Sequence, residues 1–435
     1  MRIILLSTFD LGRQPFGLSS PAAWLRSDGH HVTVADLSCG VLGDEVSSAD
    51  LVAFHLPMHT ATRLAVPVIA RVRKANPAAK LCCYGLYAPM NEPYLRGLGV
   101  EFIVGGEFEQ GLCDVANGVA PAALSLTRQQ FVKPDRIGLP SLTNYAGLFH
   151  DGVRKTVGYT EASRGCKHLC RHCPIVPVYN GVFRVVQRDV VMADIRQQVL
   201  AGAQHITFGD PDFFNGIGHA IPLVEQLHAE FPEVTYDATI KIEHLLKHRE
   251  FLRTLKTTGC LFIVSAVESV DDAVLKKLDK GHTRADFVEA LRLTREAGLQ
   301  VSPTFLPFTP WTTRASYREL LQCIADLDLI ESTAPIQLGI RLLLPAGSRL
   351  RELEEIRQAA PEFDSEALCY RWKHADPDVD ALCVAVQRVV QKTTSESRSQ
   401  TFDRIWKLAF GNERRVDFHL AARVTMPYLT EPWYC

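Results

Sequence analysis

Short apolar runs alternate with longer amphipathic stretches over the first hundred residues of this chain. The apolar runs lie at residues 2–7, 31–36, 50–55, 80–85 and 102–104, and helical spacing appears at 21–27, 60–75 and 107–116. Strands that alternate with helices predict a parallel sheet with right-handed crossovers. We therefore expect a doubly wound α/β domain over residues 1–120, with any ligand at the carboxyl ends of its strands.

A second series of the same kind begins near residue 157. Strands are expected at 157–163, 204–209, 235–240, 261–267, 300–306 and 336–344, and helices at 190–201, 219–231, 243–257, 285–297 and 314–327. This pattern predicts an open, partial (β/α)6 barrel over residues 157–349. The proline-containing stretch 121–156 lacks periodicity and is expected to be a linker, and residues 350–435 are expected to be mainly helical. The predicted fold class is α/β, with a flavodoxin-like domain first, the partial barrel in the centre and a helical C-terminal region.

Composition narrows the classes of function. The 435 residues are 47% hydrophobic and 22% charged, with a net charge of −2, so we expect no nucleic-acid partner. The apolar start of the chain is too short for a signal peptide or a membrane span, so no membrane partner is expected either. The 12 cysteines do not form a dense disulfide framework, which favours a reducing, cytoplasmic location.

Three of those cysteines lie close together, at Cys166, Cys170 and Cys173, with the spacing Cys-x3-Cys-x2-Cys. Three thiolates can hold three corners of a cubane iron–sulfur cluster and leave one iron open, whereas electron-transfer ferredoxins and structural zinc sites normally use four ligands. The triad follows the first strand of the second series, where functional loops of such barrels gather. Zinc bound with a distant histidine is the alternative.

This spacing resembles the signature of the radical S-adenosylmethionine superfamily. The resemblance implies a 4Fe–4S cluster whose open iron binds S-adenosylmethionine, reductive cleavage to a 5′-deoxyadenosyl radical, and an electron donor such as flavodoxin or ferredoxin. His172, just before the third cysteine, stands where relatives have an aromatic residue near the adenine.

Two acidic strand ends resemble cofactor-binding elements of the same superfamily. Gly209 and Asp210 stand where relatives bind the methionine amino group, and Glu268 stands where they bind the ribose or methionine part. Lys280 opens a run that relatives also carry. Each has a plainer alternative: a Gly-Asp-Pro turn at residues 209–211, an acidic helix start after Glu268, and a capping or surface role for Lys280.

The first domain resembles the cobalamin-binding-type domain that precedes many radical S-adenosylmethionine barrels, most recognisably at residues 104–109. This implies cobalamin as a further cofactor and methyl transfer to an unactivated carbon as the leading reaction. Two features depart from that pattern: the Asp-x-His-x-x-Gly motif is missing, and Tyr84-Gly85-Leu86 replaces the usual pair of glycines. His55 and His59 are expected to be packed or solvated histidines.

The chain ends Thr430-Glu-Pro-Trp-Tyr-Cys435. This ending resembles radical S-adenosylmethionine proteins whose tails carry paired cysteines, or selenocysteine and cysteine, before Ala-Glu-Pro. The resemblance suggests a record cut at a selenocysteine codon after Cys435, whose thiol could act as a redox or substrate-holding group. An incidental thiol at a disordered end is the alternative.

The sequence therefore predicts a radical S-adenosylmethionine enzyme that acts on a small-molecule or peptide substrate. The rival hypothesis is a non-catalytic iron–sulfur or zinc protein that senses redox state or passes electrons.

Overall fold

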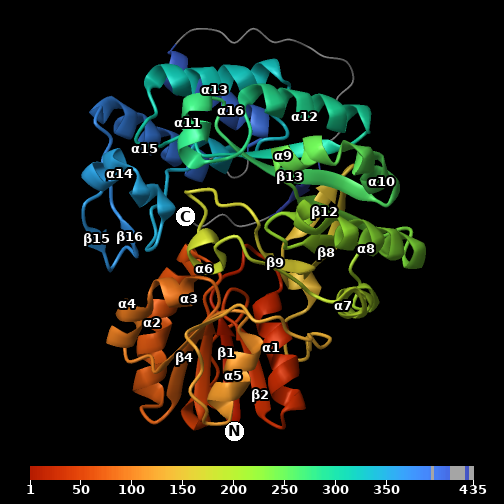
Figure 1. The fold of residues 1–435 in the computed structure, drawn as a ribbon, viewed down its shortest axis with the longest axis vertical. Coiled ribbons are helices and arrows are strands. Elements are labelled where there is room, and N and C mark those ends of the chain that lie inside the picture. Colours follow the sequence, from red (N-terminus) through yellow and green to blue (C-terminus); the bar gives the residue numbers. More distant parts are fainter. Residues whose placement is uncertain (393–395, 412–426, 431–435) are drawn as a thin grey trace.

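Two sheets dominate the computed structural model, which describes residues 1–392, 396–411 and 427–430. In Figure 1 the N-terminal sheet lies at the bottom of the molecule and the second sheet above it, with the short helix α6 (Val176–Tyr179) between them. This α/β arrangement confirms the predicted fold class. No helix among the described residues is long and apolar enough to cross a membrane.

The first sheet has six parallel strands in the order β2-β1-β3-β4-β5-β6. Its strands are β1 (Arg2–Ser7), β2 (His31–Asp36), β3 (Leu51–His55), β4 (Lys80–Tyr84), β5 (Phe102–Gly106) and β6 (Leu124–Ser125). Its helices are α1 (Phe16–Ser27), α2 (His59–Ala75), α3 (Tyr87–Met90), α4 (Glu92–Gly97) and α5 (Glu109–Ala116).

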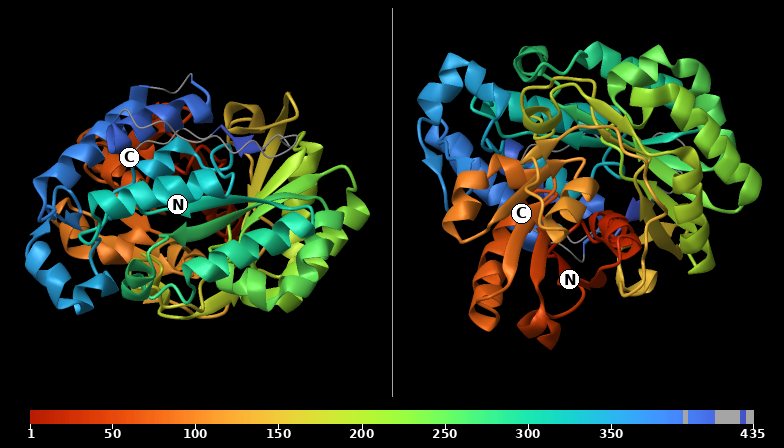
Figure 2. Two further views of the ribbon diagram at one scale, coloured as in Figure 1. Left: turned by 90° about the horizontal axis from the view of Figure 1, so that it is seen from above. Right: turned by 60° about the horizontal axis from the view of Figure 1, so that its bottom comes forward.

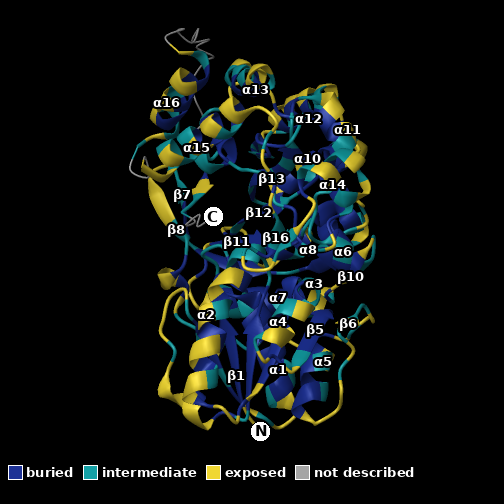
Figure 3. Ribbon diagram, turned by 90° about the vertical axis from the view of Figure 1, so that its left-hand side faces the viewer, coloured by how far each residue is buried: buried dark blue, intermediate teal, exposed yellow. Residues whose placement is uncertain are grey.

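Both faces of this sheet are covered, which explains why its strands are continuously apolar. Ile4 and Leu6 of β1 belong to a core with α2, α3 and α4, whereas Ile3 and Leu5 belong to a core with α1 and α5. Figure 3 shows the buried strands between helices whose outer faces are exposed.

The second sheet has the order β14-β13-β12-β11-β8-β7-β17. Five strands are parallel to one another: β8 (Val153–Thr160), β11 (His205–Phe208), β12 (Thr235–Thr239), β13 (Cys260–Glu268) and β14 (Gln300–Phe305). The antiparallel strands β7 (Gly147–His150) and β17 (Tyr428–Leu429) form one edge. The helices between these strands are α7 (Arg188–Leu200), α8 (Ile217–Glu230), α9 (Ile242–Lys247), α10 (Leu252–Thr257), α11 (Asp272–Leu278), α12 (Arg284–Glu296) and α13 (Arg314–Asp326).

Two elements differ from their expected form. The sixth barrel strand, expected at 336–344, is a 3-10 turn (Pro335–Leu338) followed by a single parallel bridge between Phe308 and Arg341. Prolines at 307 and 310 shorten the neighbouring segment that a full strand would pair with. The helix expected at 243–257 is divided into α9, a 3-10 turn and α10.

The C-terminal region completes the core of the second sheet. It contains α14 (Glu354–Ala359), β15 (Phe363–Asp364), β16 (Cys369–Tyr370), α15 (Pro377–Lys392) and α16 (Arg398–Phe410). Leu382, Val386 and Trp406 of the last two helices belong to the same apolar core as the barrel strands, and α16 packs against α13 (Figure 2).

The division of the chain at residues 120, 156 and 349 stays a proposal. Within the expected linker 121–156, β6 extends the first sheet and β7 extends the second.

Candidate functional site

The loop that carries the three cysteines starts at the carboxyl end of β8. The short strand β9 (Ser163–Gly165) leads into Cys166 and pairs antiparallel with β10 (Phe183–Val185). Gly165 has a φ of +71°, and a Cβ there would lie 2.3 Å from the carbonyl oxygen of Val182. The chain therefore needs glycine immediately before the first cysteine.

The three thiols are near one another without converging on a single point. Cys170 is buried and the other two are half-buried, and burial, with smaller effects from Cys170 and Cys166, raises the pKa of Cys173 to about 12. Among the described residues, the Sγ atoms do not form a group in which all three lie within 4.8 Å of one another. A single zinc ion would hold its sulfur ligands about 3.8 Å apart, whereas each thiolate of a cubane cluster binds a different iron. The spacing therefore suits a cluster better than zinc.

Two further side chains contact the cysteines. The Asn215 side-chain amide lies 3.4 Å from Cys166 Sγ, and Lys241 Nζ lies 3.8 Å from Cys170 Sγ. Both are donors and could stabilise thiolate charge. Neither was singled out from the sequence.

Glu268, His172 and Lys280 meet in one buried group. Glu268 Oε1 lies 3.2 Å from His172 Nε2 and 3.5 Å from Lys280 Nζ. Burial alone would raise the pKa of Glu268, but Lys280 and His172 outweigh it and lower the pKa to about 2. The structure thus brings together three of the residues that the sequence singled out for the cofactor.

The backbone at Glu268 is unusual. Its φ is +67°, and the pairing of β13 with β14 shifts register there. A left-handed conformation costs a residue with a Cβ about 1–3 kcal/mol, and such residues often occur at ligand-binding sites. A pocket beside it is lined by Ser269, Leu306, Pro307 and Thr312, so the Pro-rich loop after β14 borders this group.

Gly209 and Asp210 occupy the end of β11, next to the cluster loop. A Cβ on Gly209 would lie 2.0 Å from the Tyr159 hydroxyl oxygen, so the close packing of Tyr159 requires glycine. Asp210 accepts hydrogen bonds from the Ala162 N–H at 3.0 Å and from the Ser163 hydroxyl, one on each carboxylate oxygen. Burial, partly offset by these bonds, raises the pKa of Asp210 to about 7. Its carboxylate anchors the turn between β8 and β9.

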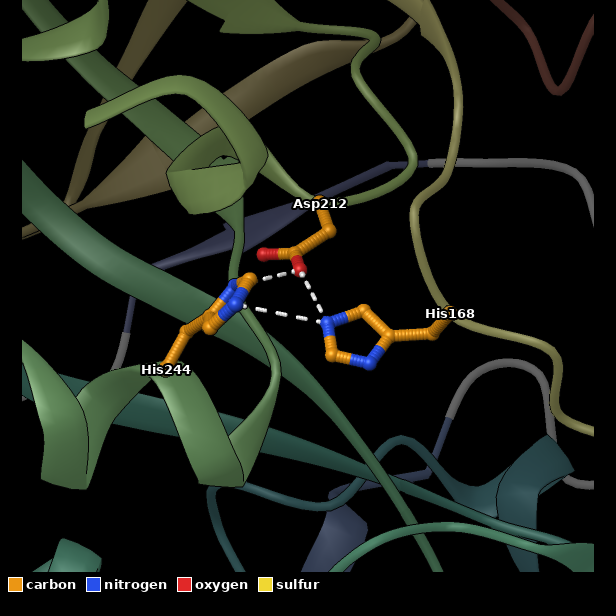
Figure 4. A group of neighbouring side chains, drawn as sticks. All are labelled: His168, Asp212 and His244. Carbon is orange, nitrogen blue, oxygen red and sulfur yellow. Dashed lines mark hydrogen bonds and ion pairs between the residues drawn. The ribbon is translucent and has the colours of Figure 1, made fainter. Parts of the chain in front are cut away.

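A second set of ligand-type side chains lies beside the cluster loop. His168, Asp212 and His244 present ligand atoms within 4.8 Å of one another (Figure 4). Sequence reasoning missed this set, although Asp212 lies only two residues after Asp210. His244 carried no signal, because a single histidine on a helix is ordinary.

An ion-pair group ties the cluster loop to the first sheet. Arg164 donates two hydrogen bonds to Glu109, at 2.9 and 2.7 Å, and one to Glu161 at 2.7 Å. Glu107, at the end of β5, lies 3.7 Å from Arg164 and accepts a hydrogen bond from the Tyr179 hydroxyl. The carboxyl edge of the first sheet therefore faces the cluster loop.

That edge is closely packed. The Tyr84 hydroxyl donates to the Gly17 carbonyl oxygen at 2.8 Å, and a Cβ on Gly17 would overlap the His55 ring. Burial, reinforced by Arg164, lowers the pKa of His55 to about 3, so the ring is neutral. Ser7 Oγ and His55 Nδ1 are buried without hydrogen-bond partners among the described residues. His55 is a packed histidine, as expected, and His59 is half-buried.

Cys435 lies outside the described residues, so the predictions for the C-terminal tail stay untested.

The amino-acid sequence is similar to a known family and to characterised proteins. Residues 160–324 match the model of the radical SAM superfamily. A putative methylthiotransferase of Methanocaldococcus jannaschii is 21% identical over 61% of this chain, and the hopanoid C-3 methylase of Methylococcus capsulatus is 23% identical over 68%. The chain spans 62% of the length of each of these two relatives.

Two solved structures share the fold. The cobalamin-dependent S-adenosylmethionine radical enzyme OxsB, with aqua-cobalamin bound, aligns with 90% of this chain and 67% of its own at a TM-score of 0.71 and 13% identity. The radical S-adenosylmethionine methyltransferase TsrM from Kitasatospora setae aligns with 82% of this chain and 77% of its own at a TM-score of 0.62 and 17% identity. With the cysteine loop at the start of the matched segment, residues 160–324 of this chain form a radical SAM domain.

Proposed function

We propose that the protein is a radical S-adenosylmethionine enzyme in which Cys166, Cys170 and Cys173 hold a 4Fe–4S cluster. The three thiols on one loop, spaced too widely to share one ion, are the observation that carries this proposal. When bound, the cluster and S-adenosylmethionine would supply a 5′-deoxyadenosyl radical by one-electron cleavage of the sulfonium. The electron donor would be a flavodoxin or a ferredoxin.

The cofactor residues divide into two roles. Glu268, held ionised by Lys280, would accept hydrogen bonds from ribose hydroxyls, and His172 would lie against the adenine. The His172 Nδ1 atom is buried and has no hydrogen-bond partner among the described residues, so it can still bond to a ligand.

At the end of β11, we propose that backbone atoms rather than the Asp210 side chain bind the methionine part of the cofactor. Because both Asp210 oxygens are engaged, backbone oxygens beside Gly209 are the better acceptors for the methionine ammonium. Asp210 would then support the loop rather than bind the cofactor directly.

The substrate is a small molecule or a peptide, from which the radical would take a hydrogen atom. Methylation is the reaction that the hopanoid methylase and TsrM favour. Sulfur insertion is the alternative that the methylthiotransferase relative favours.

Cobalamin is the second cofactor we propose, on the strength of the fold shared with OxsB. It would lie at the carboxyl edge of the first sheet, where Ser7 and His55 each leave a buried polar atom without a partner. The described side chains pack this edge closely, so the nucleotide tail could enter only if His55 and Tyr84 moved apart.

The decisive experiment is anaerobic. The reconstituted, dithionite-reduced protein is incubated with S-adenosylmethionine, and 5′-deoxyadenosine and methionine are measured by liquid chromatography and mass spectrometry. We expect both products. Their absence from a protein with an intact cluster would favour a redox sensor or electron carrier instead. Added hydroxocobalamin, followed by gel filtration and a visible spectrum, tests the second cofactor separately.

A further inference from the structure

The His168, Asp212 and His244 group is assembled from three separate segments. His168 lies in the cluster loop between Cys166 and Cys170, Asp212 follows β11, and His244 lies on α9. Figure 4 shows the Asp212 carboxylate and the two imidazole rings pointing toward one another.

The buried partners in this group are not satisfied by hydrogen bonds. Asp212 is 0% exposed, and its Oδ1 accepts from the Lys241 N–H at 3.3 Å. Its Oδ2 lies 2.7 Å from His244 Nδ1, yet neither atom has a hydrogen bond of acceptable geometry among the described residues. Leaving two buried polar atoms without partners is unfavourable, and a bound cation would satisfy both.

His168 is oriented toward the same point. Its Nε2 lies 3.7 Å from Asp212 Oδ2, while its Nδ1 lies 3.5 Å from a carboxylate oxygen of Glu243. A carboxylate on the far ring nitrogen is the usual outer partner of a metal-binding histidine, because it fixes the tautomer that presents the other nitrogen to the metal. That other nitrogen, His168 Nε2, also lies 3.3 Å from His244 Nε2, a contact that a shared metal ion would replace.

The spacing and charge suit a divalent ion of borderline softness. Nitrogen and oxygen ligands about 2.1 Å from a tetrahedral zinc ion lie about 3.4 Å apart, and the separations of 2.7 and 3.7 Å bracket that value. Asp212 and Glu243 carry two negative charges, and Lys241 Nζ, 3.4 Å from Glu243, offsets one of them. Two imidazoles and one carboxylate form a zinc ligand set that leaves a fourth position open.

We propose that His168, Asp212 and His244 form a mononuclear zinc site beside the cysteine loop, separate from the iron–sulfur cluster. Zinc at this position would fix the loop segment between Cys166 and Cys170 against β11 and α9. The proposal does not depend on S-adenosylmethionine cleavage.

The test uses the full chain with Cys166, Cys170 and Cys173 all changed to alanine, so that neither the thiols of the cluster loop nor the cluster can hold zinc. After equilibration with zinc and gel filtration, we expect about one zinc per chain by elemental analysis. Adding His244→Gln or Asp212→Asn should reduce bound zinc at least about tenfold, whereas His228→Gln on α8 should leave it unchanged. Equal zinc in the His244→Gln and His228→Gln chains, or no bound zinc before these changes, would overturn the proposal.

Two measurements guard against misfolding and against thiol binding elsewhere. Zinc should raise the unfolding temperature of the triple-alanine chain in a concentration-dependent way, and this shift should vanish with His244→Gln. Cobalt in place of zinc should give visible d–d bands without thiolate charge-transfer absorption. Thiolate bands that survive His244→Gln would place the metal on another cysteine and refute the site.

Discussion

Replacing Arg164 by methionine should destabilise the protein by removing the cation that joins the cluster loop to the first sheet. Methionine keeps an unbranched apolar stem, so the main loss is charge and hydrogen bonds. Arg164 is 5% exposed, and its partners Glu107 and Glu109 are 0% exposed. The substitution would therefore leave carboxylates buried without their cation.

The expected loss in the free energy of unfolding follows from the burial of the Arg164 ion pairs. Removing one member of a buried ion pair costs about 3–5 kcal/mol, because the remaining charge is uncompensated. Arg196 offers a matched control, since it makes the same two-bond contact with Glu230 at 2.7 Å for each bond, but with side chains 43% and 31% exposed. An exposed pair contributes about 0–1 kcal/mol. We expect the two methionine variants to differ by roughly 3 kcal/mol.

The loss should depend on pH in a definite direction. Burial already raises the pKa of Glu107 from its ordinary value to about 7, with Arg164 opposing the rise. Without Arg164 the folded-state pKa rises further. A carboxyl with a raised folded-state pKa favours folding fully below its unfolded pKa, and that contribution is lost as pH rises through the folded pKa. The deficit of Arg164→Met should thus be largest above about pH 8 and smaller near pH 5.

Denaturant unfolding of the cluster-free chain at several pH values, followed by fluorescence and circular dichroism, measures both effects. A deficit for Arg164→Met no larger than that for Arg196→Met would refute the reasoning. A large deficit that does not change with pH would instead assign the loss to packing on Phe16 and Phe108, over whose rings the guanidinium lies.

Cys170→Ala should abolish cluster absorbance and 5′-deoxyadenosine formation together, whereas Cys39→Ala, at an exposed thiol, should change neither; cleavage retained by the first variant would contradict the cluster assignment. Glu268→Gln should keep the cluster spectrum and raise the KM for S-adenosylmethionine about ten- to hundredfold, because a charged acceptor is lost; an unchanged KM would remove Glu268 from the cofactor site. Gly209→Ala should lower the unfolding temperature, since its Cβ would meet the Tyr159 hydroxyl, and Tyr159→Phe in the same chain should recover part of the loss. No recovery would mean that the strain lies in the backbone.

The pattern of apolar and polar residues predicted those helices and strands that have a clear periodicity or a continuous apolar run. Strands β1 to β5 of the first sheet were predicted within two residues at each end because both of their faces are buried and their apolar runs are continuous. The two-residue edge strand β6 was not predicted, because it lies in the stretch expected to be a linker. The prediction of a sixth barrel strand at 336–344 was wrong. Its apolar residues lie in a 3-10 turn and beside a single bridge, and an apolar run alone does not distinguish these from a strand.

The residues of the candidate site were likewise predictable where they form a local motif and not where distant segments meet. The cysteine loop is a local motif, and Glu268 was recognisable as a charge ending an apolar strand. The group of His168, Asp212 and His244 depends on contacts between residues up to 76 positions apart, such as His168 with His244. The engagement of both Asp210 oxygens likewise depends on how the β8–β9 turn folds back over β11, which periodicity does not describe.

The short strand β17 bears on how the protein behaves when it is shortened or expressed. Tyr428 and Leu429 pair with Phe149 and Leu148 of β7, and Thr430 bonds to Gly147 in both directions, so these residues cover the backbone groups at that edge of the second sheet. An uncovered edge strand is a template on which another chain can add. Versions that end before Tyr428 should therefore self-associate and lose solubility, even though they keep every residue of the cysteine loop.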